Sequence, residues 1–142
     1  MKDIRESQKL IGAIDFSTEE LLYEACIGRV NFPNNIGECS IYVYSDEGTI
    51  PHFHIIPKNI KEECCVCIYE PLYFNHGNKQ LQLNSKQRKI LNKWLKSEFK
   101  YNKKVTNWEV ISTAWIIGNG DKYAPNLPSQ PNYTNLVNMR DS

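Results

Sequence analysis

The sequence predicts an α+β domain, in which a small antiparallel β-sheet of three or four strands packs against two or three α-helices. Apolar and polar residues alternate from Cys39 onward, which is typical of half-buried strands. Residues 86–100 instead repeat apolar residues at helical spacing. The links between the expected strands are only a few residues long, and such short links join antiparallel neighbours.

Length and composition favour one domain. With 142 residues, 41% hydrophobic and 23% charged, the chain can bury roughly 68% of its unfolded surface. We expect a compact domain over residues 1–118 and an extended tail rich in Pro and Asn over residues 119–142. No apolar run approaches the roughly 18 residues of a membrane span, and the charged start does not resemble a signal peptide. We therefore expect a cytoplasmic protein without a membrane partner.

The cysteines are odd in number and crowded. Three of the five fall within four positions, at Cys64, Cys65 and Cys67, which does not resemble a secreted disulfide framework. We expect reduced thiols.

The N-terminal part carries a helix signal. Ser17 and Glu20 have the spacing of a capping box, and Leu21, Leu22 and Ala25 follow at helical spacing. This pattern predicts a helix over residues 18–27 that ends at Gly28, followed by a loop over residues 31–37.

Three strands are expected next. Ile41 and Val43 alternate with two tyrosines before a turn at residues 45–48. The second strand contains residues 49–57, and the third covers residues 64–70. Pro71 then marks a break before the short apolar piece 72–74 and a turn at 75–78. An antiparallel meander is the simplest topology.

Two more helices are expected in the second half. Ser85 can cap a helix over residues 86–100, with an apolar stripe through Leu91, Trp94 and Leu95. Asn107 can cap another helix, which ends near Gly118; its β-branched residues leave a strand as the alternative.

The segment Pro51-His52-Phe53-His54-Ile55 predicts the functional site. Side chains alternate along a strand, so His52 and His54 share one face and Phe53 and Ile55 the other. Across neighbouring strands, alternation gathers seven reactive or aromatic residues on the histidine face: Tyr42, Tyr44, His52, His54, Cys65, Cys67 and Tyr69.

The charge is unevenly distributed although the net charge is only +1. Between Lys79 and Lys104 nine basic residues stand against one acid, Glu98, a formal +8. The rest of the chain holds eight basic and fifteen acidic residues, hence −7. Such asymmetry can mark a surface that meets an anion, or a solvated helix face. The candidate anion-binding residues are Lys86, Lys89, Lys93 and Lys96.

Three kinds of chemistry remain open for the histidine face. In the first, His52, His54, Cys65 and Cys67 hold zinc, although ligands two residues apart on a flat strand fit a tetrahedral ion poorly. The second is metal-independent acid and base catalysis, as in RNA cleavage, by His52 and His54 with the hydroxyls of Tyr42 and Tyr44. In the third, the rings stack on bases or fill a partner's pockets while the lysines bind phosphates. Structural histidines, hydrogen-bonded to neighbours, are the plain alternative.

Residues from about 40 to 109 resemble a small family of uncharacterised proteins, domain of unknown function 4160. The distinctive match is the Pro-His-Phe-His segment at 51–54, preceded by Ile41 to Ser45 and followed by Trp94 and Asn107 to Glu109. Members of this family often accompany small partner genes in toxin and antitoxin arrangements. The resemblance therefore implies a nuclease-like or partner-binding role. The family tends to carry acidic residues on the strand after the histidines, where this chain has Cys64, Cys65 and Cys67.

The same segment also resembles the motif of histidine triad nucleotide hydrolases. Only two of the three histidines are present, because Ile50 or Ile56 occupies the remaining position.

Taken together, these features lead us to expect a small toxin- or phage-like protein that binds RNA, a nucleotide or a small protein partner and needs no cofactor. If the protein is an enzyme, we expect a metal-independent ribonuclease. The first alternative is a non-enzymatic protein-interaction or phage counter-defence protein, and the second is a zinc-binding structural module.

Overall fold

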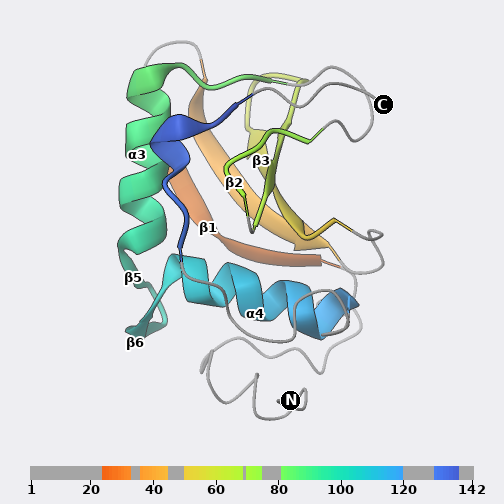
Figure 1. Cartoon of the computed structure of the whole chain (residues 1–142), viewed down its shortest axis with the longest axis vertical. Helices are drawn as coiled ribbons and strands as arrows, with labels where there is room; N and C mark the ends of the chain where they lie inside the picture. The colour runs from red at the N-terminus through yellow and green to blue at the C-terminus, as the bar shows by residue number, and fades with distance from the viewer. Residues whose placement is uncertain are drawn as a thin grey trace.

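In a computed structural model of the chain, the described residues form two α-helices that pack against an antiparallel sheet with strand order β1-β2-β3-β4, and a second sheet that pairs β5 with β6 (Figure 1). The structure describes residues 24–32, 36–44, 50–68, 70–74, 81–119 and 130–137. This arrangement confirms the predicted α+β class. The element bounds are β1 Glu24–Phe32, β2 Gly37–Tyr44, β3 His52–Pro57, β4 Cys64–Cys67, α3 Ser85–Lys96, β5 Glu98–Phe99, β6 Asn102–Thr106, α4 Asn107–Asn119 and the 3-10 helix η1 Tyr133–Asn135.

Strand β1 corrects the N-terminal prediction. Residues 24–27, expected as the end of a helix, belong to this strand, and all but Ile27 pair with β2; Asn31 and Phe32, expected in a loop, continue the same strand. The register shifts between Cys26 and Gly28, so Ile27 is an extra residue and the buried Ile27 and Val30 lie three apart. That spacing resembles a helix period although it belongs to a bulged strand. Pairing with β2 therefore determines the conformation of these residues.

The three predicted strands form the rest of the sheet as an antiparallel meander. Ile41 lies opposite Ile55, and Phe53 lies opposite Val66. These side chains are fully buried, which matches the alternation in the sequence. The third strand ends at Cys67 rather than at Glu70, and its neighbour on the far side is the short apolar piece, where Tyr73 bridges Val66.

Helix α3 begins one residue earlier than predicted and ends sooner. Asn84, not Ser85, is the N-cap: its side chain accepts from the Gln87 backbone, and the Gln87 side chain accepts from the Asn84 backbone. The helix stops at Lys96 because the next residues turn into the β5–β6 hairpin. Leu91 and Leu95 are fully buried, as the apolar stripe predicts.

Helix α4 is confirmed as a helix, with a different cap. Thr106 and Glu109 exchange backbone and side-chain hydrogen bonds of 3.0 and 3.2 Å in a capping box. The predicted cap, Asn107, instead donates from Nδ2 to the carbonyl of Trp94 at 2.8 Å. This bond joins the start of α4 to the end of α3. The β-branched residues of α4 are tolerated because nearly the whole helix is buried.

Part of the C-terminal segment packs on this body. Tyr133 of η1 is fully buried, and its hydroxyl donates to the carbonyls of Cys67 and Ile68, each at 3.0 Å. Val137 pairs with the apolar piece through backbone bonds to Pro71 and Tyr73. In Figure 1, η1 lies beside α3. Residues 130–137 therefore close one end of the core.

Several sequence predictions lie outside the described residues. They are helix residues 18–23, the turns at 45–48 and 75–78, the side chains of Tyr69 and Lys79, and most of the tail. Neither α-helix in the described part of the chain has the length and hydrophobicity to cross a bilayer.

Candidate functional site

Six of the seven residues predicted for the histidine face lie on it, and the seventh, Tyr69, is outside the described residues. In register, His54 lies between Tyr42 on β2 and Cys65 on β4, and His52 lies opposite Cys67. The rings of Tyr44 and His54 meet edge to face with centroids 4.7 Å apart. Tyr42, Tyr44, His52, His54, Cys65 and Cys67 thus share one face of the sheet.

The histidines themselves are buried. His52 is 0% exposed and His54 is 3% exposed. The His52 ring packs 4.9 Å from the ring of Phe74 and 5.2 Å from Trp115 of α4. Its Nδ1 lies 2.7 Å from the Ile50 carbonyl, so that nitrogen carries the proton. His52 is thus held in the interior, and its proposed catalytic role stays a prediction.

The two tyrosines are more accessible. Tyr42 and Tyr44 are half-buried and lie side by side, with ring centroids 5.8 Å apart and planes inclined by 8°. Their rings form the partly exposed margin of the histidine face. A ligand that approaches this face meets the tyrosines before it meets His52.

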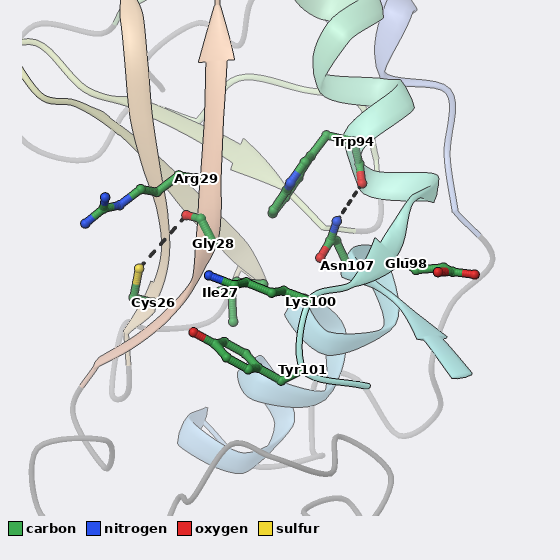
Figure 2. A pocket seen from close by; sticks show the side chains of 9 residues that line it. All are labelled: Cys26, Ile27, Gly28, Arg29, Trp94, Glu98, Lys100, Tyr101 and Asn107. Carbon is green, nitrogen blue, oxygen red and sulfur yellow. Dashed lines mark hydrogen bonds between the residues drawn. The ribbon is translucent and has the colours of Figure 1, made fainter. Parts of the chain in front are cut away.

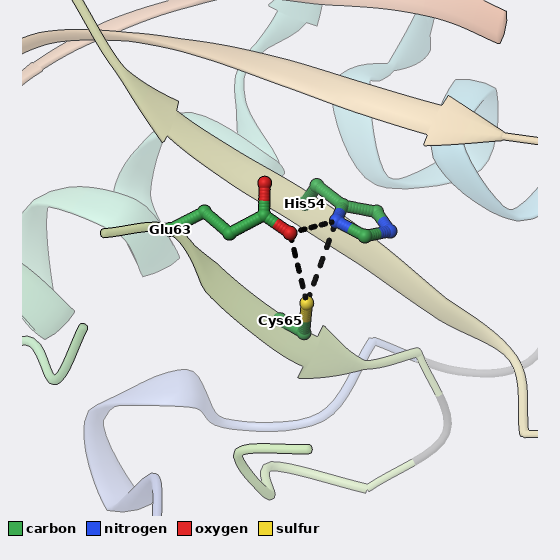
Figure 3. Close-up of polar contacts among 3 residues, drawn as sticks. All are labelled: His54, Glu63 and Cys65. Atoms are coloured by element: carbon green, nitrogen blue, oxygen red, sulfur yellow. Dashed lines mark hydrogen bonds and ion pairs between the residues drawn. The ribbon is translucent and has the colours of Figure 1, made fainter. Parts of the chain in front are cut away.

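Three potential metal ligands converge at one point of this face (Figure 3). His54 Nδ1 lies 3.1 Å from Glu63 Oε1 and 3.4 Å from Cys65 Sγ, and the sulfur lies 3.9 Å from the same Glu63 oxygen. The group among the described residues does not include His52 or Cys67, which the sequence hypothesis had placed in the same site. It includes Glu63 instead. The available signal was the Glu63-x-Cys65 spacing, which puts both side chains on one face of a strand.

The other cysteines have a different character. All five cysteines are free thiols, as predicted. Burial raises the pKa of Cys39 and of Cys67 to about 11, and the neighbouring charges of Glu38 and Glu70 respectively act in the same direction. Burial also raises the pKa of Cys64 well above its ordinary value. These thiols are therefore protonated at neutral pH and behave as small apolar groups.

The predicted lysine stripe lies on the outer face of α3. Lys86, Lys89, Lys93 and Lys96 are all exposed. Within the described part of the chain, no carboxylate forms an ion pair with them. The first turn of α3 contains no acid either. The stripe is a positively charged surface about 15 Å long, given a rise of about 1.5 Å per helical residue.

A pocket of about 610 Å³ opens between β1 and the C-terminal end of α3 (Figure 2). Its walls combine the indole of Trp94 and the ring of Tyr101 with the cations Arg29 and Lys100. The ammonium of Lys100 lies 5.4 Å from the centre of the Tyr101 ring. Cys26, Ile27, Gly28, Glu98 and Asn107 complete the lining.

Sequence reasoning missed this pocket. Its lining comes from β1, α3, the β5–β6 hairpin and the start of α4, and β1 itself was expected to be helical up to residue 27. The one available signal was the position of Trp94 and Lys100 among the lysines in the second half of the basic segment.

These features define the class of the protein as a small α+β domain with a basic helix, an aromatic pocket and a partly buried His-Glu-Cys cluster. Comparison of the chain with protein-family models, with curated proteins and with solved structures gave no match. The resemblance to the Pro-His-Phe-His family stays a prediction, and a functional conclusion has to rest on the sites themselves.

Proposed function

We propose that this protein binds single-stranded RNA, with the lysine stripe of α3 on the phosphates and the pocket beside Trp94 on a base. The observation that supports the proposal most is that the cationic and aromatic groups come from the same helix turn. Lys93, Trp94 and Lys96 all belong to the last turn of α3. A positively charged track next to aromatic platforms is the usual design of proteins that bind single strands without sequence preference.

The charge of α3 supports this proposal because helix stability does not account for it. Lys93 and Lys96 near the C-terminus interact favourably with the helix dipole. Lys86 lies in the first turn, where the dipole disfavours a cation by about 0.3 to 1 kcal/mol. A purely structural helix would gain from an acid at that position, whereas an RNA-binding helix gains from the lysine.

The pocket supports binding of a base rather than of a phosphate alone. Trp94 is half-buried, so one part of the indole is anchored and another part is accessible. Arg29 and Lys100 lie at the same pocket, and Arg29 also contacts Glu38 at 3.4 Å. Stacking on an aromatic side chain contributes about 1 to 3 kcal/mol per base. Trp94→Ala should therefore weaken RNA binding by roughly 5- to 150-fold.

The proposal concerns binding and does not include cleavage. His52 and His54 are buried among aromatic side chains, so RNA held on α3 has no direct access to them. Ribonuclease activity through His52, His54, Tyr42 and Tyr44 would require that face to open.

A salt titration tests the proposal. The fluorescence anisotropy of a labelled oligouridylate measures affinity, and log affinity should fall with log salt at about −0.7 per phosphate contact. With about three contacts, a fourfold rise in salt should weaken binding roughly 18-fold. The double variant Lys89→Gln, Lys93→Gln should bind more weakly and with a flatter salt dependence.

The matched control is Lys58→Gln, Lys61→Gln, which removes the same charge from two exposed lysines outside α3. It should leave both the affinity and the salt slope nearly unchanged. If the two double variants lost equal amounts of RNA affinity, only the net charge of the protein would matter. That result would exclude α3 as the specific binding surface. Absence of RNA binding at low salt would favour a solvated helix face for the lysines and would leave the tyrosine and histidine face as a protein-docking surface.

A further inference from the structure

His54, Glu63 and Cys65 bring one nitrogen, one oxygen and one sulfur to a common point (Figure 3). We infer that these residues bind a borderline-soft divalent cation of the zinc class, with one coordination position left for water. This inference does not depend on RNA binding, because its ligands lie on β3, on β4 and directly before β4, and they line no part of the pocket beside α3.

The three side chains are held by backbone structure on both sides. His54 and Cys65 are direct cross-strand partners in the β3–β4 ladder, so their side chains point to the same face. The Cys65 carbonyl accepts from Phe74 at 2.9 Å, and the Glu63 carbonyl accepts from Leu81 at 2.8 Å. The ligand atoms are thus positioned by the β3–β4 ladder and by backbone hydrogen bonds beside it, as a preorganised metal site requires.

The separations fit a tetrahedral zinc-class ion. Zinc lies about 2.0 to 2.1 Å from imidazole nitrogen, about 2.0 to 2.2 Å from carboxylate oxygen and about 2.3 Å from thiolate sulfur. Tetrahedral angles then put nitrogen and oxygen about 3.3 Å apart, and sulfur about 3.6 Å from each. The observed distances are 3.1 Å for nitrogen to oxygen, 3.4 Å for nitrogen to sulfur and 3.9 Å for sulfur to oxygen.

A hydrogen-bonded cluster explains this convergence less completely. If Nδ1 donates its proton to Glu63, the Cys65 thiol donates to the same oxygen only at a long 3.9 Å, and no proton lies along the 3.4 Å contact between nitrogen and sulfur. If the thiol donates to Nδ1 instead, the nitrogen and the ionised carboxylate face each other at 3.1 Å as two acceptors. A cation at the centre accepts an electron pair from all three atoms.

A nucleophilic triad is also a poorer fit. In such a triad the base contacts the nucleophile through one ring nitrogen and the orienting carboxylate through the other. Here Cys65 and Glu63 both approach Nδ1 of His54. The geometry is that of ligands around a common centre and not of a proton relay.

The donor set defines the class of metal. Calcium and magnesium prefer oxygen ligands only, whereas a set of imidazole, thiolate and carboxylate suits zinc and its neighbours. Three protein ligands leave the fourth tetrahedral position open, as in catalytic zinc sites. The Glu63 side chain is 35% exposed, so the cluster reaches solvent although the His54 side chain is only 3% exposed. Binding requires the Cys65 thiol to release its proton, so affinity should rise with pH.

Metal titration with purified protein tests the inference. Competition with a chromophoric chelator gives the stoichiometry and the dissociation constant for Zn²⁺, and Co²⁺ reports thiolate ligation through sulfur-to-cobalt charge-transfer absorption. We expect one ion per chain and charge-transfer absorption in the wild type. Cys65→Ser should abolish that absorption and weaken Zn²⁺ binding at least tenfold, since even outer partners of a metal site contribute 10- to 100-fold.

The matched control is Cys67→Ser, which makes the same substitution two residues further along the same face. It should bind Zn²⁺ like the wild type, and Cys26→Ser should as well, because Cys26 lies outside the cluster. Equal binding by Cys65→Ser and Cys67→Ser would overturn the inference. If Cys65→Ser fails to fold, the wild type still decides: Co²⁺ without charge-transfer absorption would exclude Cys65 as a ligand.

Discussion

Gly28 of β1 and Trp94 of α3 lie so close that a Cβ atom at position 28 would stand 3.0 Å from Cζ2 of the indole. Few real Cβ contacts are this short, so a larger residue at position 28 requires a shift of the indole or of β1. The contact joins the edge strand to the basic helix and forms part of the pocket wall. The absence of a side chain at residue 28 therefore determines the position of Trp94.

Gly28→Ala should destabilise the protein by about 1 to 3 kcal/mol, the usual effect of overpacking. It should also change the tryptophan fluorescence, because Trp94 has to move. Gly37→Ala is the informative comparison: residue 37 has φ of +66° and no atom within 4 Å of its Cβ position. That variant should lose stability through backbone strain without a spectral change. Identical spectra for wild type and Gly28→Ala would contradict the contact.

Tyr133→Phe should lower the free energy of unfolding by about 1 to 3 kcal/mol, because it removes a buried hydroxyl from the carbonyls of Cys67 and Ile68. Urea unfolding measures the change. Tyr101→Phe removes the same hydroxyl from a side chain that is 61% exposed, and it should change stability by less than about 0.5 kcal/mol. Equal effects would mean that residues 130–137 do not contribute to the folded core.

Stability should fall as the pH rises above about 8.5, the ordinary pKa of an unfolded thiol. Burial, aided by nearby negative charge, raises the pKa of Cys39 and Cys67 to about 11 in the folded state. Between these pH values the unfolded chain releases protons that the folded chain retains, so unfolding becomes more favourable. Each thiol contributes at most about 1.4 kcal/mol per pH unit.

Burial also raises the pKa of Tyr73 to about 12, which extends the loss of stability to higher pH. Urea unfolding under reducing conditions at about pH 7.5, 9 and 10 measures the slope. Cys39→Ala removes one of the titrating thiols. The fall in the free energy of unfolding with pH should therefore become less steep by the contribution of one proton. An unchanged slope in that variant would contradict the burial of the Cys39 thiol.

Lys86→Glu should change stability and RNA binding in opposite directions. An acid in the first turn interacts favourably with the helix dipole, so the variant should gain about 0.3 to 1 kcal/mol of stability. The same change should weaken binding of the oligouridylate. Lys96→Glu, in the last turn of α3, should weaken binding as well but should lose stability. Parallel changes in stability for the two variants would exclude the dipole explanation.

His52→Ala should destabilise the protein by roughly 2 to 4 kcal/mol, because it leaves a cavity between Phe74 and Trp115. Thermal or urea unfolding measures this change. Unfolding of this variant would by itself abolish any activity of the protein in cells. A loss of activity is therefore evidence for catalysis by His52 only at temperatures where the variant remains folded. Wild-type stability in His52→Ala would mean that the ring is not part of the packed interior.

The local pattern of the central strands was sufficient to predict them. Alternation from Ile41 to Tyr44 and from His52 to Ile55 determines which side chains share a face, because strand geometry has a period of two. The apolar stripe through Leu91 and Leu95 likewise predicts α3 and the exposure of its lysines. Both results depend only on residues close together in the chain.

By itself, then, the sequence determined the α+β class, the two faces of β3 and the basic outer face of α3. Only the tertiary structure decided that β1 is a bulged edge strand, that His52 is enclosed by Phe74 and Trp115, and that Glu63 joins His54 and Cys65. The physical reason is that a local pattern specifies the direction of a side chain, whereas burial and ligand geometry depend on which distant segment packs against it. Gly28 and Trp94 are 66 positions apart in the chain and yet form one wall of the same pocket.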